Sequence, residues 1–296
     1  MLQDRSQGVH IGVVARSFQI RATDETFDHD LFREKVVVPV KQLLAQTGHL
    51  VQKLVIVTNA DVRSAYAEEI AADGTTPTMR AVRAAFADDA RVEAIACTDW
   101  GKNVGSGNAL NVGDSYINGT TDLEFVLNWS PEMAVLPRHL YRAIDMMLDR
   151  PAMQVVGFYR EMWWERTQWN IVQNTIALYR LSTLMAMGGF ARKCDGDDGV
   201  MVQTEEYGPV LRAGMEDFHY VLRLLRRNRE YRHGIVGLEA PLEWHVDFDP
   251  QSERGKNHLR KVARQYAVMR EWCKDVFPEQ GVYETLNQYF ESRISQ

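Results

Sequence analysis

The chain has 296 residues, of which 45% are hydrophobic and 25% are charged, and its formal net charge is -6. This composition is typical of a globular protein with a well-filled core, and the acidic pI near 5.8 argues against general attraction to nucleic acid. No apolar run approaches the roughly 20 residues that a membrane-spanning helix needs, and residues 1–6 lack the apolar core of a secretory signal. Three widely spaced cysteines predict neither a disulfide framework nor a metal site, so we expect a cytoplasmic protein.

The first half of the chain alternates short apolar runs with segments of helical periodicity. Strands that alternate with helices predict a parallel sheet with right-handed crossover connections, which defines the α/β class. The expected strands lie at residues 9–14, 54–57, 92–96, 123–127 and 155–158, and the expected helices at residues 32–46, 62–72, 79–87 and 137–148, with one more that ends near residue 117.

The second half of the chain does not continue this regular alternation of predicted strands and helices. An apolar segment at residues 171–187 predicts a long helix, and the acidic, glycine-rich residues 192–208 predict a loop. An amphipathic pattern predicts a helix at residues 216–227. We also expect a strand pair within residues 233–246 and a helix with one apolar stripe at residues 259–276.

The most informative stretch is the run from Lys102 to Gly113, in which three glycines and three asparagines lie among small residues. It follows the expected strand at residues 92–96 and leads into a helix, where uncovered backbone amides favour an anion such as phosphate. The carboxyl ends of parallel strands also form the usual ligand crevice of an open α/β sheet. The run therefore predicts an anion-binding turn, although an ordinary turn with small packing residues is the alternative.

Several motifs in a fixed order resemble those of family 2 glycosyltransferases. The segment from Asn103 to Gly113 resembles the N-x-G-x-x-x-A-x-N-x-G run of that family position for position. Residues 176–190, which close on Gly-Gly-Phe, the acidic pair at residues 216–217, and Glu-Trp-His at residues 243–245 resemble later motifs in the expected order.

The resemblance implies the GT-A fold, a Rossmann-like, mixed and mainly parallel sheet flanked by helices. Residues 1–250 would form this domain, and residues 251–296 would form a C-terminal helical extension packed on it. The implied activity is the transfer of a sugar, with inversion, from a nucleotide-diphosphate donor to an acceptor hydroxyl.

The resemblance also implies that eight residues, which lie at strand ends or in the glycine run, form the donor-binding side of the site. Asp61 is equally well explained as an N-cap of the helix expected after it. The candidate donor-binding residues are Ala15, Arg16, Asn59, Asp61, Lys102, Asn103, Asn108 and Asn128.

Asp217 matches the position of the general base, and Glu216 would orient the acceptor or support that base. An inverting transfer needs a carboxylate that accepts the proton of the attacking hydroxyl. The alternative is structural, because acidic residues are favoured in the first turn of a helix.

The sequence departs from the family at its metal-binding motif. The D-x-D that would hold Mn or Mg falls near residues 128–130, which read Asn-Trp-Ser. Asn128 still offers a carbonyl oxygen, and Glu132 and His245 are the candidate metal ligands. A protonated His245 with Arg254 or Lys256 is an alternative counter-charge for a diphosphate.

The acceptor would be a saccharide, a lipid-linked group or a small molecule, and Trp163, Trp164 and Trp169 would line its side of the site. Packing in the core or at an interface explains these tryptophans equally well. Five arginines between residues 223 and 232 would dock on anionic lipid at a membrane periphery, or else form a solvated helix face. The apolar stripe at residues 259–276 would pack on the domain or form a homodimer contact.

Two other functions are alternatives to the glycosyltransferase interpretation. A non-catalytic protein that binds a nucleotide sugar or a partner protein would account for the missing D-x-D. A nucleotidyltransferase would need a glycine- and lysine-rich loop after the first strand, where this chain reads Ala15-Arg16-Ser17-Phe18, so it ranks third.

Overall fold

The computed structural model describes most of the chain. The described residues are 8–17, 23–60, 68–98, 106–131, 133, 135–158, 176–190, 201–211, 216–228, 230–236 and 290–293, with isolated residues between 252 and 274. At the start of the helix that begins at Glu216, the description is of the backbone alone.

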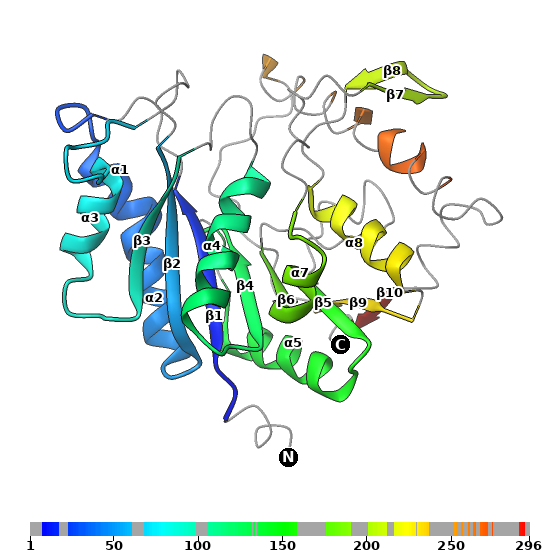
Figure 1. Cartoon of the computed structure of the whole chain (residues 1–296), viewed down its shortest axis with the longest axis horizontal. Coiled ribbons are helices and arrows are strands. Elements are labelled where there is room, and N and C mark those ends of the chain that lie inside the picture. Colours follow the sequence, from blue (N-terminus) through cyan, green and yellow to red (C-terminus); the bar gives the residue numbers. More distant parts are fainter. Residues whose placement is uncertain are drawn as a thin grey trace.

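A large sheet forms the centre of the molecule (Figure 1). Its strands are β1 (Ile11–Ser17), β2 (Val51–Asn59), β3 (Val92–Cys97), β4 (Phe125–Trp129), β5 (Met153–Phe158), β6 (Ile176–Arg180), β9 (Arg232–Val236) and β10 (Phe290–Arg293). They are arranged in the order β10-β9-β5-β6-β4-β1-β2-β3. Among these described strands, only β6 runs antiparallel to its neighbours, which are β4 and β5. The prediction of a mixed, mainly parallel sheet is therefore confirmed.

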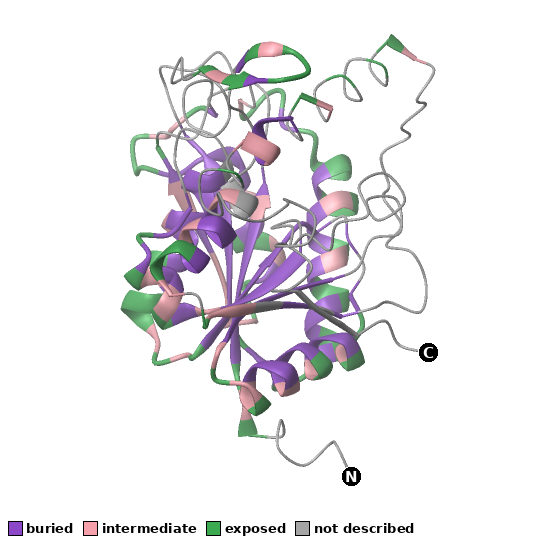
Figure 2. Ribbon diagram, turned by 90° about the vertical axis from the view of Figure 1, so that its right-hand side faces the viewer, coloured by how far each residue is buried: buried purple, intermediate pink, exposed green. Residues whose placement is uncertain are grey.

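Helices cover both faces of this sheet, so the molecule has three layers. One face carries α1 (His29–Phe32), the π-helical turn η2 (Arg33–Val37), α2 (Val38–Thr47), α3 (Pro77–Ala85) and α5 (Pro137–Asp149). The other carries α4 (Ser106–Thr120), α7 (Leu181–Ala186) and α8 (Glu216–Arg227). Figure 2 shows the buried strands between helices whose exposed residues face outward.

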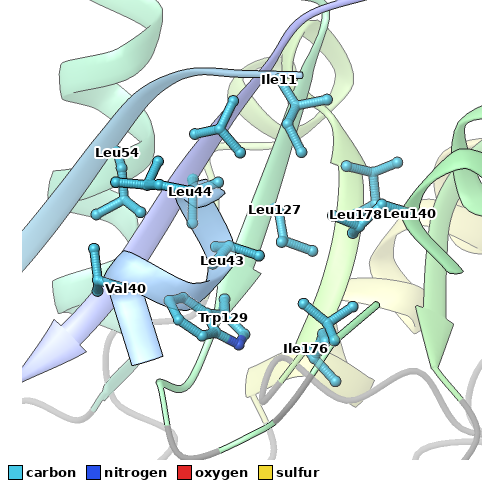
Figure 3. Close-up of a cluster of buried hydrophobic side chains, with 14 of the residues drawn as sticks. Ile11, Val40, Leu43, Leu44, Leu54, Leu127, Trp129, Leu140, Ile176 and Leu178 are labelled. Atoms are coloured by element: carbon cyan, nitrogen blue, oxygen red, sulfur yellow. The ribbon is translucent and has the colours of Figure 1, made fainter. Parts of the chain in front are cut away.

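Alternation along each strand divides the core into two layers, because successive side chains of a strand point to opposite faces. Val13 and Ala15 of β1 pack toward α2, whereas Val14 between them packs toward α4. Figure 3 shows the first layer, where Leu43 and Leu44 of α2 lie beside strand residues and Trp129. The alternation decides which side chain at each strand end faces α4.

The sequence prediction is wrong at residues 171–187, which do not form one long helix. Residues 176–180 form strand β6, and a short helix, α7, follows. A fully buried strand and a buried helix have the same continuous apolar run, so periodicity does not distinguish them. Pairing with β4 and β5 on both sides selects the strand.

Two smaller expectations fail in the part of each that the structure describes. Residues 68–72 are not helical, although the pattern at residues 62–72 predicts a helix, and residues 61–67 lie outside the described part. The expected loop at residues 192–208 contains strand β7 (Met201–Thr204), which pairs with β8 (Gly208–Leu211) in a separate antiparallel hairpin. Gly208 has a positive φ of 64°, which glycine adopts without strain.

The described C-terminal residues contribute to the core layer under α4 and to the edge of the sheet. The described residues between 253 and 274 are helical, and Met269 among them packs in the core beside α8. Strand β10, which the sequence does not predict, pairs in parallel with β9. Within the described residues, no helix is both long and apolar enough to cross a membrane.

Candidate functional site

The carboxyl ends of β1, β2 and β4 bring polar side chains together on the face that α4 covers. Arg16, Asn59 and Asn128 each lie two residues beyond a valine of the core layer under α4, so they share its face. The guanidinium of Arg16 donates to Oγ of Ser130, at 3.5 Å, just after β4 ends. The structure thus brings three of the predicted donor-binding residues to one edge of the sheet. The side chain of Ala15 belongs to the opposite core layer.

The second half of the glycine run forms the first turns of α4, and its asparagines bind the protein interior. Asn108 is buried, and its amide donates to Sγ of Cys97 at the end of β3, at 3.3 Å. Gly113 lies against β1, where an added Cβ would overlap with Val14. This half of the run therefore makes the close packing contacts that the structural alternative predicts. Binding of a donor by Asn108 stays a prediction.

Asn111 connects the glycine run to the Gly-Gly-Phe segment, which lies almost eighty positions later in the sequence. Its Nδ2 donates to the carbonyl oxygen of Phe190 at 2.8 Å, and the amide of Phe190 donates to Oδ1 of Asn111 at 2.7 Å. Gly189 has a positive φ of 68°, and a Cβ there would overlap with the Asn111 amide. Two motifs of the sequence analysis are therefore one structural unit.

Helix α8 is fixed to the end of α7 by arginine side chains. Arg223 donates to the carbonyl oxygens of Met187 and Gly189, and Arg227 donates to that of Ala186 at 3.0 Å. These carbonyls end a helix, where cationic donors are favoured. The contacts fix the helix whose first turn contains the predicted catalytic residues Glu216 and Asp217.

A buried carboxyl group that sequence reasoning missed lies between α4 and β4. Asp114 is fully buried, and Nδ2 of Asn128 donates to its Oδ2 at 3.4 Å. Burial raises the pKa of the Asp114 carboxyl to about 8, against the opposing effects of the Asn128 amide and the Arg16 charge. Burial, and then the Asp114 charge, raise the pKa of the Tyr220 hydroxyl on α8. The available sequence signal was a charged residue at the three-residue spacing of Asn108 and Asn111.

A second buried carboxyl group lies on the opposite face of the sheet, at the start of α3. Glu68 accepts a hydrogen bond from the hydroxyl of Thr78, and burial raises its pKa to about 7. Thr76 caps α3, and its hydroxyl lies 3.2 Å from that of Thr58 at the end of β2. Glu68 therefore contacts the first turn of α3, on the face of the sheet away from α4.

The remaining predicted site residues cannot be placed. The side chains of Glu216 and Asp217 are not described. Eight further candidates lie outside the described residues: Asp61, Lys102, Asn103, Glu132, Trp163, Trp164, Trp169 and His245.

The described residues do not form a divalent-metal site. They contain no group of three or more acidic, histidine or cysteine side chains that would hold a metal. Asn128, near which the resemblance to family 2 glycosyltransferases predicts a D-x-D, is neutral, buried and hydrogen-bonded to Asp114. The two predicted metal ligands, Glu132 and His245, lie outside the described residues.

The layers, the strand order and the polar edge together define a Rossmann-like fold of the GT-A type. No protein-family model matches the sequence, and no curated protein is significantly similar to it. Solved structures are similar in fold. One is a mannosyltransferase from Pyrobaculum calidifontis in complex with GDP-Man and Mn²⁺, at 14% identity, with a TM-score of 0.52 over 95% of this chain and 67% of that chain.

Another is glucosyl-3-phosphoglycerate synthase from Mycobacterium tuberculosis. Its complex with phosphoglyceric acid has a TM-score of 0.52 at 13% identity, over 92% of this chain and 82% of that chain. Its complex with Mg²⁺ and uridine diphosphate has a TM-score of 0.51 at 12% identity, over the same shares of the two chains. At these identities the similarity concerns the fold.

Proposed function

We propose that this chain is a glycosyltransferase that moves a sugar from a nucleotide-diphosphate donor to an acceptor hydroxyl. The observation that carries the proposal is the convergence of Arg16, Asn59 and Asn128 at the carboxyl edge of a GT-A sheet. The fold is shared with a mannosyltransferase solved with GDP-Man and with a synthase solved with uridine diphosphate, which supports a nucleotide-sugar donor.

On the donor side, Arg16 would bind the diphosphate. Its guanidinium is partly exposed at the strand end, and a guanidinium makes strong charge-assisted hydrogen bonds to phosphate oxygens. Asn59 and Asn128 would supply neutral donors and acceptors beside it. Lys102 and Asn103 are proposed as donor-binding residues only because they lie in the glycine run that resembles the family motif.

On the acceptor side, Asp217 would act as the general base. Its carboxylate accepts the proton of the acceptor hydroxyl while that oxygen bonds to the anomeric carbon and the nucleoside diphosphate leaves. The reaction is then a single displacement, with inversion. Glu216 would orient the acceptor, and Trp163, Trp164 and Trp169 would pack against it. The acceptor class and a homodimer are parts of the proposal that await experiment.

The test compares the wild-type protein with Asp217→Asn. UDP and GDP are titrated calorimetrically, and UDP- and GDP-sugars are then assayed for transfer and hydrolysis. We expect Asp217→Asn to bind the nucleotide normally and to lose about 100-fold or more of its turnover, because one general base contributes this much. Glu230→Gln, an exposed change beyond the same helix, is the control and keeps its activity. Equal turnover in Asp217→Asn and the wild type would refute the assignment.

A non-catalytic nucleotide-sugar-binding protein is the second candidate, and Asn128 favours it. A neutral, buried amide stands where a carboxylate would help to bind a metal. Nucleotide binding without turnover, unchanged by Asp217→Asn, would establish this candidate. Repeating the titrations with Mn²⁺, with Mg²⁺ and with a chelator decides whether the chain uses a divalent metal.

A further inference from the structure

The space between α4, β4 and α8 contains buried polar atoms without hydrogen-bond partners among the described residues. They are Oδ1 of Asp114, Oδ1 of Asn128 and the hydroxyl of Tyr220. All three side chains are at most 1% exposed. Buried polar groups are normally paired, and an exception calls for an explanation.

Stability does not explain the carboxyl group at position 114. It is fully buried next to Gly113, which packs against Val14 and Val57 of the apolar core layer under α4. A buried carboxyl that receives one long hydrogen bond destabilises the fold relative to an amide or an apolar group. Groups that oppose stability in this way are typical of functional sites.

Three charged or polar neighbours of Asp114 come from three different elements. Arg16 on β1 acts on it electrostatically, Asn128 on β4 donates to it, and Tyr220 on α8 lies within the range of its charge. Two of these neighbours, Arg16 and Asn128, are the proposed donor-binding residues at the sheet edge.

We propose that Asp114 is a positioning residue of the donor site, which fixes the amide of Asn128 beside Arg16. The hydrogen bond from Nδ2 of Asn128 sets the orientation of that amide, so its carbonyl oxygen is held in one direction. An acidic side chain is thus present beside position 128 of β4, on the adjacent helix α4. This inference rests on the proposed donor site.

An amide N–H can donate a hydrogen bond to a carboxylate, whereas two carboxylates cannot hydrogen-bond to each other unless one of them is protonated. Asn128→Asp places two carboxyls in contact inside the protein, where one of them must keep its proton. Asp114→Asn leaves two amides, each of which can donate to the other, so the direction of the Asn128 amide is no longer fixed. The exchange variant Asp114→Asn/Asn128→Asp restores one carboxyl and one amide, with their elements swapped.

The test measures the affinity for UDP and GDP by calorimetry and the melting temperature at pH 8. We expect Asp114→Asn to weaken nucleotide binding by roughly tenfold, because a misoriented Asn128 amide loses about one hydrogen bond to the nucleotide. Its melting temperature should rise, because a destabilising buried carboxyl has been removed. A residue with a purely structural role would lose stability and affinity together. The exchange variant should recover the affinity to within about threefold of the wild type.

Asp122→Asn is the matched control, since it makes the same chemical change at an exposed residue between α4 and β4. It should bind UDP and GDP as the wild type does. Wild-type affinity in Asp114→Asn, or an exchange variant as weak as Asn128→Asp alone, would overturn the positioning role and leave the donor site intact. A wild-type protein that binds neither nucleotide would refute the donor site, and the positioning role with it.

Discussion

The described part of the protein contains two buried carboxyl groups that have different surroundings. Glu68 and Asp114 lie on opposite faces of the sheet, and burial raises the pKa of each. Glu68 accepts a hydrogen bond from the hydroxyl of Thr78 in the first turn of α3, while its Oε2 has no partner among the described residues. Asp114 has one long hydrogen bond, from a proposed site residue. Similar shifts therefore have different meanings, and the neighbouring groups distinguish them.

Glu68 makes the stability of the protein dependent on pH. Its pKa rises from the ordinary 4.5 to about 7 on folding, so the folded state binds more protons between these values. The free energy of unfolding then falls as the pH rises through this window, by up to about 3 kcal/mol. We expect Glu68→Gln to flatten this fall in urea unfolding at pH 5 and pH 8. The neighbouring, exposed Glu69→Gln should leave the fall unchanged, and an equal flattening there would contradict the assignment.

Gly113 is required by close packing rather than by its backbone conformation. A Cβ at this position would overlap with Val14 of β1, so Gly113→Ala should destabilise the protein by about 1–3 kcal/mol. Gly119 lies on the same helix with open space around it, and Gly119→Ala should stabilise by about 0.5–1 kcal/mol. Urea unfolding of both variants tests the pair. A Gly113→Ala protein as stable as the wild type would show that α4 can move away from β1.

At the scale of elements, α4, α7 and α8 form one unit over the site face of the sheet. Asn111 joins α4 to Phe190 beyond α7, and Arg223 joins α8 to the same segment. Two of the arginines predicted to face solvent or lipid therefore cap a helix, namely Arg223 and Arg227. Association with a membrane periphery stays a prediction, resting on the remaining arginines.

We expect Arg223→Ala to loosen α8. The loss of charged hydrogen bonds to two carbonyls should cost about 1.5–3 kcal/mol of unfolding free energy. It should also lower turnover, because the first turn of α8 carries Asp217. Arg226→Ala, an exposed change on the same helix, should cost less than about 0.5 kcal/mol. Thermal unfolding and the transfer assay give both quantities, and a stable but inactive Arg223→Ala would point instead to a direct role in the site.

At the scale of the whole molecule, the central sheet explains where prediction succeeded. The alternation of strands and helices up to residue 158 has a local cause, the period of apolar residues, and the structure confirms its strands and most of its helices. The prediction failed at residues 176–180, which take their conformation from β4 and β5 on either side. Strand β10 is short and depends on β9, so no local pattern indicates it.

The candidate site also has features that the sequence predicted and features that only the structure revealed. The sequence alone determined the α/β class, the glycine run at a helix start and the polar residues at the ends of β1, β2 and β4, because period and residue type are local properties. Only the tertiary structure decided that Asn111 binds Phe190 and that Asp114 faces Asn128. Those contacts join residues from different elements, and a pairing between distant segments depends on how the layers pack, which no local pattern encodes.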